Sequence, residues 1–249
     1  MRSGLLLAVA GLILGLLLLP NVLAITVLGG ISSFNGAVIL ASSNSVIFVY
    51  PALTISGKPP GMYLGSYTDW VGMGILIGLT PNPQYETLDT NTATPLLIDP
   101  TTGKPGTTNM VIVVVSGVLV HSVIHWLERE SASGGAISPV YYDQDATNRM
   151  FRLRTTGAVL VSQPLGAPNS YDHFVIYTVV DSSGNTYYVF FGFRWRGTTA
   201  ASHKLLYYVQ TGTLISQTQG YQVHRWDDSN GDGITNPSPT DTYTLITSG

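Results

Sequence analysis

The feature that most constrains the fold is an unbroken apolar run, Met110 to Val115 (MVIVVV), in which almost every residue is β-branched. β-Branched side chains favour extended backbone, and an apolar run without alternation suits a strand buried on both faces. Ser116 and Gly117 follow and allow the chain to turn sharply. The run therefore predicts an internal strand of a sheet.

Helical periodicity begins directly after this turn. Apolar residues at the spacing i, i+3, i+4, i+7 lie on one face of a helix that extends to about Glu130. They are Val120, Val123, Ile124 and Leu127. A second apolar run, Ala136 to Tyr142, comes next. Strand, helix and strand in this order predict a βαβ unit, in which the second strand is parallel to the first.

Two later runs predict a β-hairpin. Phe174 to Val180 and Tyr187 to Phe193 are rich in β-branched and aromatic residues, and they flank the turn sequence Asp181 to Asn185 (DSSGN). A short Gly-containing loop between two such runs is typical of antiparallel strands.

A second helix is expected after Gly197, where Thr198 or Thr199 can cap it and the pattern continues to about Val209. Its packing face comprises Ala200, Ala201, Leu205 and Tyr208. The segment Gly192 to Thr199 joins strand to helix, so its backbone N–H groups can hold an anion. Alternatively, Trp195 and Arg196 contact a subunit or a glycan, or simply pack.

The first half of the chain, residues 25–105, is predicted to be β-rich, because short apolar runs alternate with clusters of Gly, Pro, Ser and Asn. The clearest runs are Ala37 to Leu40, Val46 to Tyr50 and Gly74 to Leu79. The loop Asp99 to Asn109 is either a boundary with the α/β region, residues 106–249, or a long surface loop. The expected class is α+β or mixed α/β.

The N-terminus has the features of a secretory signal, residues 1–24. Arg2 supplies a positive end, Leu5 to Leu19 is apolar, Pro20 breaks the helix, and Ala24 offers a small residue at a cleavage point. The apolar run is shorter than the roughly twenty residues that span a bilayer. Retention as an anchor, or a pilin-like cut after Gly4, are the alternatives. The chain is expected to act outside the cytoplasm.

Composition limits the possible partners and the possible cross-links that stabilise the fold. Only 10% of residues are charged, so the surface is largely neutral, which suits an acidic medium or a surface covered by neighbouring subunits. A net charge of −3 argues against nucleic acid. The chain contains no cysteine, which excludes disulfides and thiolate metal sites. Bound calcium is a candidate for stabilising the fold instead.

The most specific motif is DSNGDGITN, which begins at Asp228. Its oxygen side chains alternate, with a glycine at position six and a carbonyl at position seven, like the start of an EF-hand calcium loop. The proposed ligands are Asp228, Asn230, Asp232, Ile234, Asn236 and Asp241. Position twelve is Pro239 rather than glutamate, so Asp241 or Asp227 has to complete the shell. A surface turn that binds nothing is the alternative.

Two catalytic patterns are incomplete. His121, His125 and Glu128 share a helical stripe that can face zinc, but Ser122 stands where a metalloprotease needs its glutamate. For a serine hydrolase, Ser116 lies at a strand end, yet no serine has the G-x-S-x-G context. The candidate bases His173, His203 and His224 have no sequence link to it. Neither pattern predicts an enzyme.

Three segments together resemble archaeal surface-layer proteins. They are residues 109–143, residues 171–209 and the closing residues 221–249, and they occur in the order of that family. Within the second segment the family skeleton is kept at Gly192, Gly197, Thr198, Ala200 and Ala201. The first segment departs from the family because its turn, Val115 to Gly117, lacks a glycine pair and a proline, and the chain has no N-x-[ST] glycosylation sequon.

The resemblance implies a non-enzymatic structural protein of an archaeal cell surface, S-layer-like or part of a surface filament. The expected cofactor is calcium, and the expected partners are copies of the same chain or other cell-surface proteins. The membrane is a partner only through an uncleaved N-terminal segment. The alternative is a secreted hydrolase or a carbohydrate-binding module that uses the aromatic residues Trp70, Trp195 and Tyr207 and one of the histidines.

Overall fold

The protein is described by a computed structural model that covers residues 46–51, 71–72, 74, 85–88, 93, 98–99, 102–117, 121–129, 135–211 and 220–249. The strands are β1 (Val46–Tyr50), β2 (Tyr85–Leu88), β3 (Val111–Val115), β4 (Val140–Gln144), β5 (Asn148–Leu153), β6 (Val159–Pro164), β7 (Tyr171–Val180), β8 (Thr186–Gly192), β9 (Gly220–Asp227) and β10 (Thr242–Ser248). The helices are α4 (Ser122–Glu128) and α5 (Trp195–Thr211). The predicted α+β class is confirmed.

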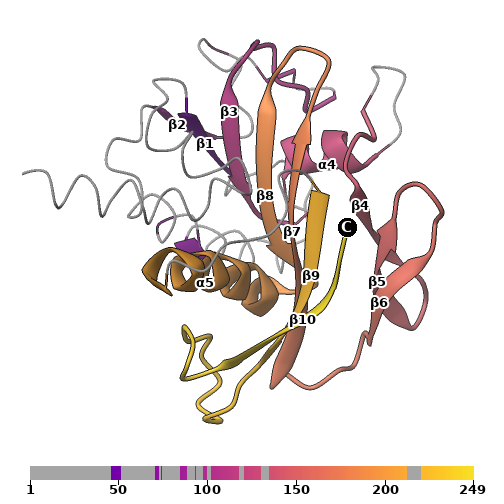
Figure 1. The fold of residues 1–249 in the computed structure, drawn as a ribbon. Coiled ribbons are helices and arrows are strands. Elements are labelled where there is room, and N and C mark those ends of the chain that lie inside the picture. The colour runs from indigo at the N-terminus through magenta and orange to yellow at the C-terminus, as the bar shows by residue number, and fades with distance from the viewer. Residues whose placement is uncertain are drawn as a thin grey trace, which may run out of the picture.

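The main sheet has seven strands in the order β10-β9-β7-β8-β3-β1-β2 (Figure 1). One half is parallel, because β8, β3, β1 and β2 run in the same direction. The other half is antiparallel, because β7 pairs with β8 and β9, and β9 pairs with β10. A second, antiparallel sheet contains β4, β5 and β6.

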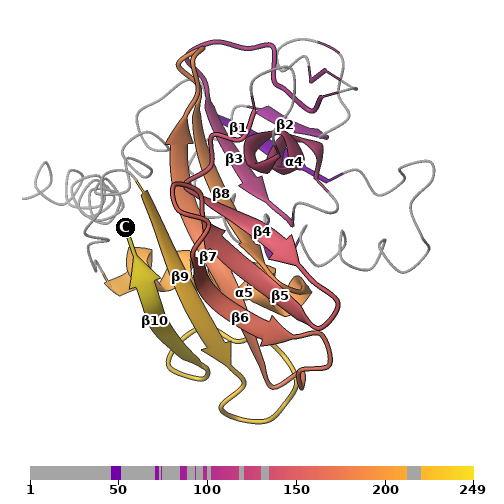
Figure 2. The same cartoon turned by 90° about the vertical axis from the view of Figure 1, so that its right-hand side faces the viewer.

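The elements form three layers around two apolar cores (Figures 1 and 2). Helix α5 covers one face of the main sheet and buries Ala200, Ala201 and Leu205 against that face. Helix α4 and the small sheet cover the opposite face, where Leu127 and Phe151 are fully buried. All five residues of β3 are buried, as expected for a strand that is covered on both faces.

The small sheet corrects the predicted βαβ unit. The strand after α4 begins at Val140 and pairs antiparallel with β5, not parallel with β3. The main-sheet position beside β3 is taken by β8, which comes from much later in the chain. An apolar pattern predicts that a segment is extended, but it does not identify the pairing strand.

The predicted hairpin is confirmed. β7 and β8 pair antiparallel from Phe174↔Gly192 to Val180↔Thr186. The connecting turn is organised by Asp181, whose carboxylate accepts hydrogen bonds from the backbone N–H groups of Ser183 (2.7 Å) and Asn185 (2.9 Å). Gly184 has a positive φ of 79°, which a glycine adopts without strain.

In the first half, the predicted strand Val46 to Tyr50 is confirmed as β1. Gly74 is helical, so the strand predicted from that residue does not begin there. The run at residues 37–40 and the leader at residues 1–24 lie outside the described residues. β1 and β2 belong to the same sheet as β3, so the loop near residue 105 connects parts of one sheet. None of the helices that the structure describes is long and apolar enough to cross a membrane.

Candidate functional site

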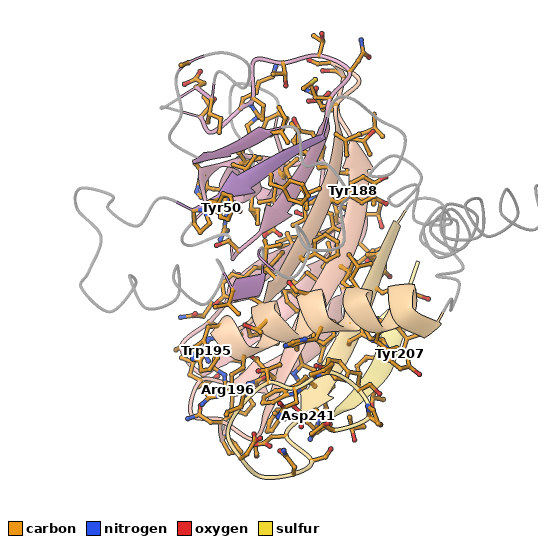
Figure 3. The ribbon with its side chains drawn as sticks, turned by 90° about the vertical axis from the view of Figure 1, so that its left-hand side faces the viewer. Tyr50, Tyr188, Trp195, Arg196, Tyr207 and Asp241 are labelled. Atoms are coloured by element: carbon orange, nitrogen blue, oxygen red, sulfur yellow. The ribbon has the colours of Figure 1, made fainter. Side chains whose placement is uncertain are left out.

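The loop that carries the calcium motif connects β9 to β10 at one end of the molecule, next to the start of α5 (Figure 3). The carboxylate of Asp228 accepts hydrogen bonds from the backbone N–H groups of Gly231 and Gly233, each at 2.9 Å. Both glycines have positive φ angles, 73° and 74°, which other residues adopt only with strain. The glycines therefore let the chain curl around the carboxylate at position one of the motif.

The alternating oxygen side chains of the loop lie close together. Asp232 accepts hydrogen bonds from the side-chain amides of Asn230 (2.8 Å) and Asn236 (3.0 Å). Its other oxygen accepts the backbone N–H of Ile234 at 2.7 Å, and this bond lowers the pKa of the exposed Asp232 carboxyl. The structure thus brings Asn230, Asp232 and Asn236 together, with an ionised carboxylate among them.

Asp241 is held by hydrogen bonds within the protein. It is 1% exposed, and its carboxylate accepts hydrogen bonds from the Trp226 indole (2.8 Å) and the backbone N–H of Asn236 (2.7 Å). These bonds fix the end of the loop to β9 and draw Asp241 inwards. Asp227, the other candidate for completing the shell, pairs with Arg225 at 2.6 Å.

Among the described residues, no three His, Cys, Asp or Glu side chains form a group that could hold a metal ion. A cation in this loop would therefore depend on amide and carbonyl oxygens in addition to Asp228 and Asp232. Calcium accepts such neutral oxygen ligands. The loop is joined to α5 because the Arg196 guanidinium donates to the carbonyl of Gly233 at 3.4 Å.

The proposed zinc stripe is not assembled. His121 is buried at the start of α4, where one ring nitrogen lies 3.2 Å from the carbonyl of Val49 and the other accepts the backbone N–H of Val123. His125 is exposed. Glu128 is buried on the side of α4 that faces the small sheet. Three side chains that point to different surroundings cannot share one metal.

Glu128 instead connects α4 with both sheets. Its carboxyl accepts the backbone N–H of Tyr142 in β4 at 2.9 Å and lies 3.5 Å from the Tyr177 hydroxyl of β7. Burial raises the pKa of Glu128 from 4.5 to about 8, although the Tyr142 N–H and the nearby arginines favour the ionised form. The side chain is therefore a neutral acid at the centre of the packing between α4 and the two sheets.

The anion position predicted at the β8–α5 junction is filled by the protein itself. Asp172 of β7 accepts the backbone N–H groups of Gly197 (2.9 Å) and Arg194 (3.1 Å). Its carboxylate also lies 3.7 Å from the Arg194 guanidinium. The predicted caps Thr198 and Thr199 lie inside α5, which begins at Trp195. Burial raises the pKa of Asp172 to about 6, opposed by Arg194 and by the Gly197 N–H.

The components of a serine hydrolase remain separate. Ser116 is fully buried at the end of β3. His173 contacts Gln163 at 2.8 Å on one face of the main sheet, whereas His224 stacks on Phe174 on the other face. Burial lowers the pKa of His173 to about 4 and that of His224 to about 3, so both rings are neutral near pH 7.

The aromatic residues considered for sugar binding do not form one platform. Trp195 and Tyr207 lie towards opposite ends of α5 (Figure 3), and twelve helical residues span roughly 18 Å. The Arg196 guanidinium covers the Trp195 ring at 4.3 Å. Trp70 lies outside the described residues.

The sequence did not indicate the structural roles of two carboxyl groups, Glu128, which was considered only as a zinc ligand, and Asp172. The only available signal was a charged residue at the edge of an apolar segment, WLE in one case and YDHFVI in the other. No family model, no curated protein and no solved structure matches this chain.

Proposed function

We propose that this chain is a non-enzymatic structural protein of an archaeal cell surface, S-layer-like or part of a surface filament, that assembles with copies of itself. The N-terminal segment, residues 1–24, directs export in this proposal. A calcium ion in the loop at Asp228, Asn230 and Asp232 stabilises the folded subunit.

The observation that carries the proposal is that the chain has few charged residues and that many of these are buried or paired within the protein. Only 10% of residues are charged, and several acidic side chains are buried, namely Glu128, Asp172, Asp181 and Asp241. Others pair within the chain, as Arg152 does with Asp143 at 2.8 Å. Soluble monomers rely on surface charge to stay apart. A surface this poor in free charge suits a protein whose faces are covered by neighbours.

The calcium part of the proposal is supported by the preformed loop. Asp228 already holds the N–H groups that a calcium loop organises around its first ligand, and Asp232 keeps a negative charge beside two amide side chains. A ligand that binds only the folded state stabilises it by about 2.7 kcal/mol at a hundredfold excess over Kd. For a chain of this size that corresponds to a Tm increase of about 5–10 °C.

Calcium binding is tested by melting the protein with added calcium and with EDTA. The double variant D228N/D232N keeps oxygen ligands and turn geometry but removes both charges, so it should lose the calcium-dependent increase in Tm. Asp145→Asn is the matched control, because Asp145 is also exposed and accepts backbone N–H groups, from Thr147 and Asn148, each at 2.7 Å. A wild-type Tm that is identical in calcium and EDTA would remove calcium from the account.

Self-association is tested by sedimentation velocity over a wide concentration range, in calcium and in EDTA. The proposal expects species larger than the 26.7 kDa monomer that increase with concentration. A single monomeric boundary at every concentration would contradict the proposal, whatever the calcium result.

A further inference from the structure

The outermost strand of the main sheet at its antiparallel end is β10, Thr242–Ser248, with the sequence TYTLITS. No described strand lies beyond it (Figure 2). The last pair with β9, Gly249 and Tyr221, exchanges both backbone hydrogen bonds. Because antiparallel ladders alternate, intervening residues of β10 direct their N–H and C=O groups away from β9. Among the described residues nothing pairs with this side of β10, so its outward N–H and C=O groups can bind one more strand.

β10 lacks the charged residues and the proline that often protect an edge strand. It contains no lysine, no other charged residue and no proline, whereas natural edge strands commonly carry such residues to prevent pairing. Its apolar side chains Leu245 and Ile246 are 50% and 42% exposed. An irregularity interrupts the pairing with β9 only between Leu245 and Thr247, so the half from Thr242 to Leu245 is regular.

The charges next to this edge neutralise each other. Thr242 and Thr244 of β10 pair with Asp227 and Arg225 of β9, and those two side chains form an ion pair at 2.6 Å. The two charged side chains opposite Thr242 and Thr244 are already paired with each other, so neither offers a counter-charge to an acidic or basic partner strand. A strand of threonine, serine and aliphatic residues would leave no charge unpaired, and β10 is itself such a strand.

We infer that β10 pairs antiparallel with β10 of a second copy of this chain, about a two-fold axis, and joins two main sheets into one. The inference rests on the proposed function and specifies one of its contacts. A two-fold contact of this kind is isologous and joins two copies only. A sheet or filament therefore needs at least one further contact elsewhere on the surface.

Single-cysteine cross-linking tests the pairing directly, because the chain has no cysteine of its own. Cysteine is placed in turn at Thr242, Thr244, Leu245 and Ser248 of the full chain, and disulfide-linked dimer is measured under mild oxidation. In a two-fold antiparallel pair only residues at the axis face their own copy. Their Cα atoms are then about 4.5–5.5 Å apart, within the range that a disulfide spans.

The inference expects a high yield of cross-linked dimer at one position and yields at least about tenfold lower at the positions farthest from it. Val180→Cys is the control, since Val180 is 46% exposed but lies at the hairpin end of an internal strand. Equal yields at all β10 positions and at Val180 would indicate random collision and would overturn the inference.

A charge substitution gives a second test that does not depend on oxidation. Leu245→Lys adds a like charge to each copy along the paired edge and should eliminate the β10-linked dimer in sedimentation, whereas Val180→Lys should not. If the protein forms large assemblies while L245K changes nothing and no β10 position cross-links, the edge pairing is wrong and the proposed function stands. If wild type remains monomeric, both are wrong.

Discussion

The buried acid Glu128 should make the stability of this protein decrease as the pH rises. In the folded state its pKa is about 8, whereas the ordinary value is 4.5. Between these two values the folded chain keeps a proton that the unfolded chain releases. The free energy of unfolding therefore decreases with increasing pH across this window, and replacing the acid by glutamine, which cannot titrate, should remove that component.

The size of the effect follows from the width of the window. Each pH unit is worth about 1.4 kcal/mol for one proton. From about pH 5 to about pH 7.5 the unfolding free energy of the wild type, relative to Glu128→Gln, should therefore decrease by about 3 kcal/mol. Other titrating groups, including Asp172 and the histidines, are present in both proteins and largely cancel in this difference.

The assay is chemical denaturation of both proteins at several pH values, followed by circular dichroism. Asp145→Asn is the control, because exposed Asp145 has a lowered pKa and is already ionised in both states over this range. Its difference from wild type should not change with pH. If the difference in unfolding free energy between wild type and E128Q is also independent of pH, Glu128 is not a buried neutral acid.

Two further predictions concern the start of α5. Asp172→Ala removes the acceptor for the backbone N–H groups of Gly197 and Arg194, so the unfolding free energy should decrease by about 3 kcal/mol. The decrease should be smaller in Asp172→Asn, because asparagine keeps one acceptor oxygen. Equal losses in both variants would contradict this role of Asp172. Gly197→Ala would place a Cβ 2.7 Å from the carbonyl of His173, so it should destabilise by about 2 kcal/mol. Gly166→Ala meets no atom within 4 Å and should change stability by less than about 0.5 kcal/mol. Chemical denaturation measures all four variants, and a neutral G197A would show that this close approach is not tight.

Local signals in the sequence were sufficient for several elements. The hairpin of β7 and β8 was predicted because both runs are apolar and the turn between them consists of Asp, Ser, Gly and Asn. β1 and β3 were predicted from continuous apolar runs. In each case the evidence lies within a few consecutive residues, where propensity and turn chemistry act.

Features that depend on distant partners were not predicted. The small sheet was missed because β5 and β6 each carry an irregular pattern, with arginines in β5 beside buried Phe151. The cap of α5 comes from Asp172, more than twenty residues earlier, rather than from the nearby threonines. Asp241 was predicted to bind a cation, but its carboxylate is engaged by Trp226 of the neighbouring strand. The spacing of residues along the sequence does not indicate these contacts between distant segments.

Electron microscopy of the purified protein in the presence of calcium tests the central claim most directly. The account predicts ordered sheets or filaments with a constant repeat, built from copies of this chain. Dispersed particles of monomer size at high protein concentration would contradict it.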